Sequence, residues 1–201
     1  MQRLLIYGRT VSHLKPRQVG YYLLRRVLPA PRFNGADRIS VRRRPDISMP
    51  APLAGAMAPG GEYQFRFLNV AKRFEPGRVD WASAEMPKLW RYNLHYFDYI
   101  LDTGRPAENV CELIADWIRH NPAGTGDGWE PYTASLRIVN WIKLFLREDF
   151  AARVQPAWLE SLHRQAAWLE RNIEYHILAN HYLMNGKALF FAGAYFEGAE
   201  A

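Results

Sequence analysis

From Trp81 onward, hydrophobic side chains recur every three or four residues in segments joined by short polar loops. This spacing predicts amphipathic helices, each with an apolar stripe that packs against a core. The expected helices span residues 89–101, 106–120, Thr133 or Ser135 to Arg147, and 156–173. Helices of this length joined by short loops are typical of antiparallel helical hairpins, so the fold class we expect is all-α.

The segment ahead of these helices has a different character. Residues 11–29 show a shorter amphipathic pattern with Pro16 in its first turn, which predicts one more helix. Residues 30–62 are rich in Pro, Gly, Ala and Arg, as expected of a linker. Residues 63–67 alternate aromatic and polar side chains and predict one short strand. We therefore divide the chain into a basic arm with its linker, residues 1–62, and a helical domain, residues 63–201.

The stretch from Asn172 to Gly193 is expected to form a fifth, buried helix, although polar side chains interrupt it. These are His176, Asn180, His181, Asn185 and Lys187. Burying such groups costs free energy unless each finds a partner. On a continuous helix Asn180 would share a face with His176, and Asn185 would lie one turn from His181. Two interpretations stay open: a polar network between packed helices, or side chains directed at a ligand.

Charge is distributed unevenly along the 201 residues. The formal net charge is +6, but the first 50 residues carry +9 and the remainder carries −3. A basic segment can mark contact with nucleic acid or with a membrane surface. A solvated, loosely folded arm is the simpler interpretation, and we expect no nucleic-acid partner. The helical domain is not basic, so its net charge gives no argument for a groove that binds polyanions.

A single cysteine, Cys111, excludes an internal disulfide and falls within a helical pattern as a small core residue. No apolar run reaches the length of a transmembrane span, and the N-terminus lacks the features of a signal peptide. We therefore expect a cytoplasmic protein, or a periplasmic or secreted one if the N-terminus is misassigned. Nucleotide-binding, zinc-protease and α/β-hydrolase motifs are absent from the sequence, and we expect neither a cofactor nor a metal.

Two segments carry a resemblance to a known family. The stretch N-I-E-Y-H-I-L-A-N-H-Y-L-M-N-G-K-A-L is similar to the Asn-His helix of the heparinase II/III-like polysaccharide lyases, which are related to alginate lyases. The loop G-D-G-W-E-P-Y-T-A-S-L-R-I-V-N-W is similar to a second segment of that family, with Thr133 where Pro is commoner. The resemblance covers residues 63–201 and implies part of an (α/α) toroid. Full-length relatives carry further toroid helices and a β-sandwich domain, so we expect this chain to be a truncated N-terminal part.

The resemblance also implies which side chains contact an acidic polysaccharide. They are Trp129, Glu130, Tyr132, Arg137, Asn140 and Trp141 from the loop and its helix, and Tyr92, Asn93 and Tyr96 from the helix at 89–101. An arginine can grip a carboxylate or sulfate at two points, and a tryptophan offers a flat surface to a sugar ring. The residues alone leave another arrangement open, in which Arg137 pairs with Glu130 and Trp141 lies in the core.

Members of the family cleave acidic polysaccharides by β-elimination, in which a base removes the C5 proton of a uronic acid and the C4–O bond breaks. That proton is poorly acidic beside a charged carboxylate, so hydrogen-bond donors must neutralise the carboxylate. The resemblance assigns this task to Asn180, with His181 beside it, and places the proton-transferring Tyr and His beyond Ala201. The expected function is the N-terminal part of a lyase for uronic-acid-containing polysaccharides, inactive alone. The alternatives are a non-catalytic glycan-binding or remnant domain and a purely structural helical module.

Overall fold

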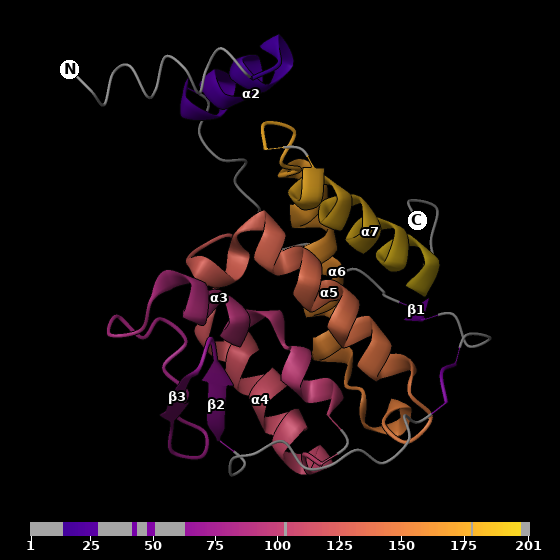
Figure 1. Ribbon diagram of the computed structural model, residues 1–201. Coiled ribbons are helices and arrows are strands. Elements are labelled where there is room, and N and C mark those ends of the chain that lie inside the picture. Colours follow the sequence, from indigo (N-terminus) through magenta and orange to yellow (C-terminus); the bar gives the residue numbers. More distant parts are fainter. Residues whose placement is uncertain are drawn as a thin grey trace.

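The computed structural model describes residues 14–27, 42–43, 48–50, 63–102, 104–177 and 179–197, and this part of the chain is mostly helical (Figure 1). The α-helices are α2 (Pro16–Val27), α3 (Lys88–Tyr96), α4 (Ala107–His120), α5 (Pro131–Leu146), α6 (Pro156–Arg171) and α7 (Ala179–Tyr195). Short 3-10 helices are η1 (Asp98–Leu101), η2 (Asp127–Trp129) and η3 (Ala151–Arg153). The predicted helical class is confirmed. Among the described residues no helix has the length and apolar character needed to cross a membrane.

Two small antiparallel sheets accompany the helices. The predicted short strand is β2 (Gln64–Phe67), which pairs with β3 (Val70–Arg73). Leu68 and Asn69 connect them with positive φ angles, the backbone of a tight hairpin turn. The second sheet joins β1 (Arg42–Arg43) to β4 (Phe196–Glu197). This pairing and the backbone hydrogen bonds of Met49 to Leu146 and Glu148 attach parts of the predicted linker to the helical domain.

Helix α5 forms the centre of the core. It contacts α3, α6 and α7, and all but four of its sixteen residues are buried. Figure 1 shows it running through the middle of the helical domain, with α7 alongside it. The aromatic residues of the sequence gather around it, since Phe97 packs against Trp81, Trp117 and Trp141 with ring centroids 5.5–6.3 Å apart. Aromatic residues make up 14% of the sequence, and these large side chains fill much of the core.

The helix predicted over residues 89–101 breaks at Phe97. Helix α3 ends at Tyr96, and Phe97 takes a left-handed φ of 61° before η1 begins. Tertiary contacts compensate this unfavourable conformation, because Phe97 is fully buried and Asn140 Nδ2 donates a hydrogen bond of 2.9 Å to the Tyr96 carbonyl. The prediction of one continuous helix was wrong because neither contact can be inferred from local spacing.

The stretch from Asn172 to Gly193 is also not one helix. Helix α6 ends at Arg171, residues 172–177 form turns, and α7 begins at Ala179 with a φ of 46°. Asn172 Nδ2 donates to the Trp168 carbonyl, which satisfies a carbonyl at the end of α6. His176 therefore lies ahead of α7 and does not share a helical face with Asn180.

The start of α5 also differs from its prediction. The helix begins at Pro131, which occupies the first helical position, and not at Thr133 or Ser135. Proline is favoured there because that position needs no backbone N–H donor. Ser135 lies inside the helix, where its hydroxyl donates to the Pro131 carbonyl at 2.8 Å.

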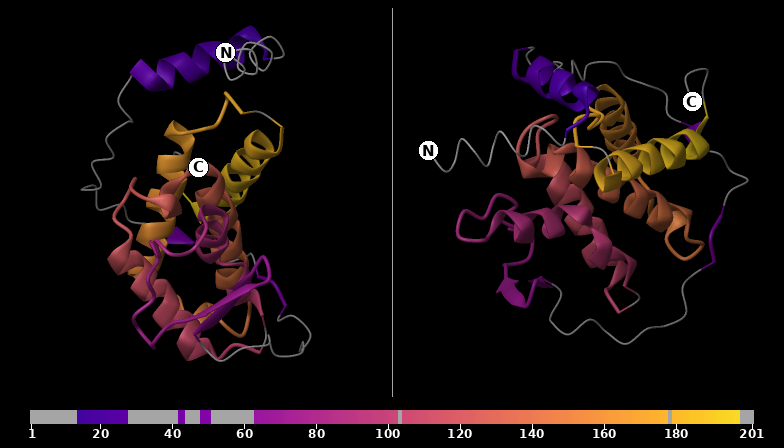
Figure 2. Two further views of the ribbon diagram at one scale, coloured as in Figure 1. Left: turned by 60° about the vertical axis from the view of Figure 1, so that its left-hand side comes forward. Right: turned by 45° about the horizontal axis from the view of Figure 1, so that its top comes forward.

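The predicted N-terminal helix is present as α2, which lies against the turn that precedes α7 (Figure 2). Gln18 Nε2 donates to the His176 carbonyl at 3.2 Å, and the Tyr21 ring lies 4.9 Å from the Tyr175 ring. The ends of the predicted segment, residues 11–13 and 28–29, lie outside the described residues, as does most of the linker at 30–62.

Candidate functional site

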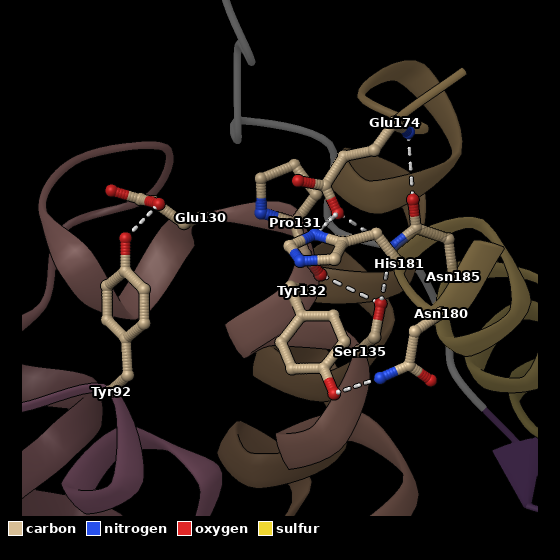
Figure 3. A network of polar contacts seen from close by, with 9 residues as sticks. All are labelled: Tyr92, Glu130, Pro131, Tyr132, Ser135, Glu174, Asn180, His181 and Asn185. Atoms are coloured by element: carbon tan, nitrogen blue, oxygen red, sulfur yellow. Dashed lines mark hydrogen bonds and ion pairs between the residues drawn. The ribbon is translucent and has the colours of Figure 1, made fainter. Parts of the chain in front are cut away.

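A cluster of polar side chains forms where the first turn of α5 meets the first turns of α7 (Figure 3). Tyr132 comes from α5, and Asn180 and His181 come from α7. Asn180 Nδ2 donates to the Tyr132 hydroxyl at 3.2 Å, and the centroids of the Tyr132 and His181 rings are 4.3 Å apart. Asn180 is exposed and Tyr132 and His181 are half-buried, so the cluster opens at the surface. The structure thus brings together two segments that the sequence singled out separately.

A buried layer supports this surface cluster. Asn185, on α7, is fully buried, and its Nδ2 donates to Ser135 Oγ at 2.9 Å and to Glu174 Oε2 at 3.3 Å. Its Oδ1 accepts from the Glu174 backbone N–H at 2.8 Å. The amide therefore joins α5, α7 and the turn between α6 and α7. The polar-network interpretation is confirmed for Asn185, whereas Asn180 lies at the surface and its role at a ligand stays a prediction.

We expect Asn185→Ala to lower the free energy of unfolding by about 2 kcal/mol, because the change leaves buried groups of Glu174 and Ser135 without partners. Urea denaturation followed by circular dichroism measures this quantity. Asn180→Ala is the matched control on the same helix, and it should cost about 0.5 kcal/mol or less because Asn180 is exposed. Equal losses in the two variants would contradict the division into a buried layer and a surface layer.

A second group lies beside the first, around the residue that precedes α5. The Glu130 carboxylate accepts a hydrogen bond from the Tyr92 hydroxyl and forms an ion pair with Lys88 Nζ at 2.7 Å. Burial and the hydrogen bond to Glu130 raise the pKa of Tyr92 to about 12. Burial also raises the pKa of Tyr96, and the hydrogen bond to Glu130 raises that of Lys88. Tyr92 therefore remains protonated at neutral pH and acts as a hydrogen-bond donor.

Arg137 and Trp141, predicted to contact substrate, lie in the core. Both are fully buried. The Arg137 guanidinium donates to Gln165 Oε1 at 2.8 Å and to the Gly128 carbonyl at 2.6 Å. Its Cζ atom lies over the Trp117 ring, 3.9 Å from the ring centroid. The burial of both side chains argues against the predicted grip of Arg137 on a carboxylate or sulfate and against the predicted contact of Trp141 with a sugar ring. The alternative pairing of Arg137 with Glu130 is also wrong, since Glu130 binds Tyr92 and Lys88.

The remaining predicted residues include further buried side chains as well as accessible ones. Trp129 is buried and donates from Nε1 to the Asn121 carbonyl at 3.1 Å. Asn140 is buried and donates to the Asp98 carboxylate as well as to the Tyr96 carbonyl. Tyr96 is also buried, and its ring centroid lies 6.1 Å from that of Tyr132, so it borders the accessible cluster from the core side. Asn93 donates to the Leu89 carbonyl one turn earlier in α3. Of the predicted set, Tyr132, Asn180 and His181 therefore form the accessible cluster, with Tyr92 and Glu130 beside it.

Glu174 is the functional candidate that the sequence analysis missed. Its carboxylate is buried, and Oε2 lies 3.1 Å from His181 Nδ1. The available signal was an acidic residue among apolar ones in N-I-E-Y-H-I-L, but its partner depends on the turn between α6 and α7. Within the described residues, no group of three or more His, Cys, Asp or Glu side chains is arranged to hold a metal ion.

The site can also be set beside known proteins. The chain matches no protein-family model, no curated protein and no solved structure. Its function is therefore inferred from the geometry of the Tyr132–Asn180–His181 cluster and from the resemblance of its sequence segments.

Proposed function

We propose that this chain is the N-terminal part of a polysaccharide lyase that cleaves uronic-acid-containing acidic polysaccharides by β-elimination. The observation that carries the proposal is the pair Asn180 and His181 in the first turn of α7. Both contact Tyr132, Asn180 through a hydrogen bond to its hydroxyl and His181 through its ring. An exposed amide can donate hydrogen bonds to a carboxylate, and an imidazole next to it can contact the same sugar residue. A purely structural network would not need to place these two groups at the surface.

The chemistry asks for such donors. When a base takes the C5 proton, the electron pair forms the C4=C5 double bond, and the C4–O bond breaks as the leaving oxygen takes up a proton. Negative charge develops on the uronate carboxylate during this step, and positioned donors stabilise it. Asn180 is proposed to donate to that carboxylate, with His181 beside it in contact with the same sugar residue. Tyr92 is an unsuitable base here, since its raised pKa keeps the hydroxyl protonated.

We further propose that the helices form part of an (α/α) toroid and that other helices and a β-sandwich domain supply the proton-transferring Tyr and His. The apolar surface of α7 supports this proposal. Leu183 and Phe190 lie seven residues apart on one face, and they are 64% and 75% exposed to solvent among the described residues. Apolar side chains grouped on one helix face are typical of a surface that another element covers.

The test measures ultraviolet absorbance of the unsaturated uronate product on a panel of acidic polysaccharides. This chain is compared with the longest open reading frame that contains it. Activity in the longer form alone is the expected result. Activity in the 201-residue chain would overturn the assignment of proton transfer to later segments. No product from either form would overturn the lyase proposal and favour non-catalytic glycan binding, which titration with the same polysaccharides would detect.

Asn180→Ala tests the site itself. We expect the variant to keep its thermal midpoint but to bind an active polysaccharide at least about tenfold more weakly, because a donor to the carboxylate is lost. Binding is measured by calorimetric titration. Gln155→Ala, which removes an exposed amide just ahead of α6, is the control and should bind like the unchanged chain. Unchanged binding by Asn180→Ala would contradict the assignment of this residue.

A further inference from the structure

The position of the Glu174 carboxylate is unusual for an acidic residue. It lies in the turn between α6 and α7, and only 6% of the residue is exposed. Burying a carboxylate is unfavourable unless hydrogen bonds compensate the loss of water. Both compensating donors come from α7: His181 Nδ1 at 3.1 Å and Asn185 Nδ2 at 3.3 Å, each to Oε2. The carboxylate is thus committed to one imidazole and one buried amide.

Glu174 is itself held in place from two sides. Its backbone N–H donates to Asn185 Oδ1, and the Asn185 amide in turn donates to Ser135 Oγ on α5. Ser135 Oγ donates to the Pro131 carbonyl at the start of the same helix. Figure 3 shows this chain of contacts next to Tyr132, Asn180 and His181. The carboxylate is therefore a rigid acceptor, and it is not a side chain that happens to reach the histidine.

A fixed carboxylate determines how the histidine carries its proton. A carboxylate only accepts hydrogen bonds, so His181 Nδ1 must be the protonated nitrogen in that contact. The ring face lies against Tyr132, which restricts rotation of the imidazole about its side-chain bonds. With Nδ1 and the ring face both engaged, Nε2 is the nitrogen on the opposite edge of the ring. The His181 side chain keeps 37% of its surface exposed, which leaves room for a ligand beside the ring.

We propose that Glu174 is a positioning residue, which holds His181 in the Nδ1–H tautomer, so that the unprotonated Nε2 accepts a hydrogen bond from a hydroxyl group of the uronate that Asn180 binds. This role rests on the proposed lyase function, but the orientation of the imidazole can be measured without it. Carboxylates that orient a functional histidine through its second ring nitrogen commonly affect activity when they are removed.

The experiment uses two variants and two measurements. In the ¹⁵N-labelled 201-residue chain, two-bond ¹H–¹⁵N correlation spectra at mildly alkaline pH identify the tautomer of His181. We expect the Nδ1–H form in the unchanged chain, a shift toward the Nε2–H form in Glu174→Ala, and partial recovery in Glu174→Gln, which keeps one acceptor oxygen. Glu170→Ala, an exposed carboxylate near the end of α6, is the matched control and should leave the tautomer unchanged.

Activity is measured on the longer, active form. Glu174→Ala should lower kcat about ten- to a hundredfold with little change in KM, as expected when a functional group loses its orienting partner. An unchanged tautomer in a folded Glu174→Ala chain overturns the proposal, and so does a changed tautomer with unchanged kcat. If the unaltered long form cleaves no polysaccharide, the lyase function fails. The tautomer spectra then still decide whether Glu174 orients His181. If Glu174→Ala does not fold, Glu174→Gln is the remaining test: its neutral carbonyl is a weaker acceptor, so the Nδ1–H fraction should fall below that of the unchanged chain, and an equal fraction overturns the proposal.

Discussion

Arg137→Ala is expected to lower the free energy of unfolding by about 4 kcal/mol, the largest single-residue effect we predict. The guanidinium is fully buried, and the hydrogen bonds that the structure gives it all go to neutral acceptors: Gln165 Oε1 and the carbonyls of Gly128 and His95. Removing it leaves those buried acceptors unsatisfied and opens a cavity beside Trp117. One side chain thus connects α5 to α6, to η2 and to the end of α3.

Urea denaturation of the variant, followed by tryptophan fluorescence, measures the effect. Arg78→Ala is the control, because Arg78 is 80% exposed, and its loss should cost about 0.5 kcal/mol or less. Arg137→Lys is expected to recover only part of the loss, because an ammonium group cannot reproduce the planar fork of donors. A loss below about 1 kcal/mol in Arg137→Ala would show that the core rearranges to satisfy the acceptors itself.

The same arginine illustrates why the candidate site could be predicted only in part. Arginine is almost never fully buried without a partner, and the resemblance of S-L-R-I-V-N-W to a lyase segment favoured a role for Arg137 at a ligand. The acceptors that allow its burial lie 9 and 28 positions away in the sequence. Gly128 also illustrates this dependence on tertiary packing, because a Cβ there would lie 2.8 Å from His95 Nδ1. No local pattern indicates such contacts.

Helices with a strong apolar period were predictable almost to their ends. The expected helix at 106–120 is α4, Ala107–His120, and that at 156–173 is α6, Pro156–Arg171. A proline marks each start, since Pro106 comes just ahead of α4 and Pro156 is the first residue of α6, and both helices have an uninterrupted stripe. The breaks at Phe97 and Ala179 were not predictable, because each is a left-handed residue other than glycine and depends on tertiary contacts.

Within the site, Asn180 and His181 could be singled out because polar groups in an apolar stretch need an explanation. Their environment could not be derived, because it depends on where α7 begins. A continuous helix would have placed His176 near Asn180, whereas the actual break brings Glu174 to His181. Sequence identified the residues of the surface cluster, and tertiary structure determined which carboxylate supports them.

The folded protein should lose stability as the pH falls from 6.5 toward 3, because His95 is buried as the neutral imidazole. Its Nε2–H donates to the Trp81 carbonyl at 3.0 Å, and Nδ1 accepts from Trp117 Nε1 at 3.0 Å. Burial, reinforced by the nearby positive charge of Arg137, lowers the pKa of His95 to about 3. The pKa of the same group in the unfolded chain is about 6.5.

The direction follows from proton binding. Between the two pKa values the unfolded chain binds a proton at His95 that the folded chain does not, so stability rises with pH in this window. The contribution is fully present above pH of about 6.5 and falls by about 1.4 kcal/mol for each pH unit below it. By pH of about 4.5 the loss from this residue reaches roughly 2 to 3 kcal/mol. Protonation of Nδ1 would also remove the acceptor of the Trp117 hydrogen bond.

Urea denaturation at a series of pH values between 6.5 and 4.5 tests this in the unchanged chain and in His95→Gln, whose amide can donate and accept but does not titrate. We expect the stability difference between the two proteins to shrink by about 2 kcal/mol across the series. Parallel curves for the unchanged chain and His95→Gln would mean that His95 is protonated in the folded protein and that its two hydrogen bonds are not those described.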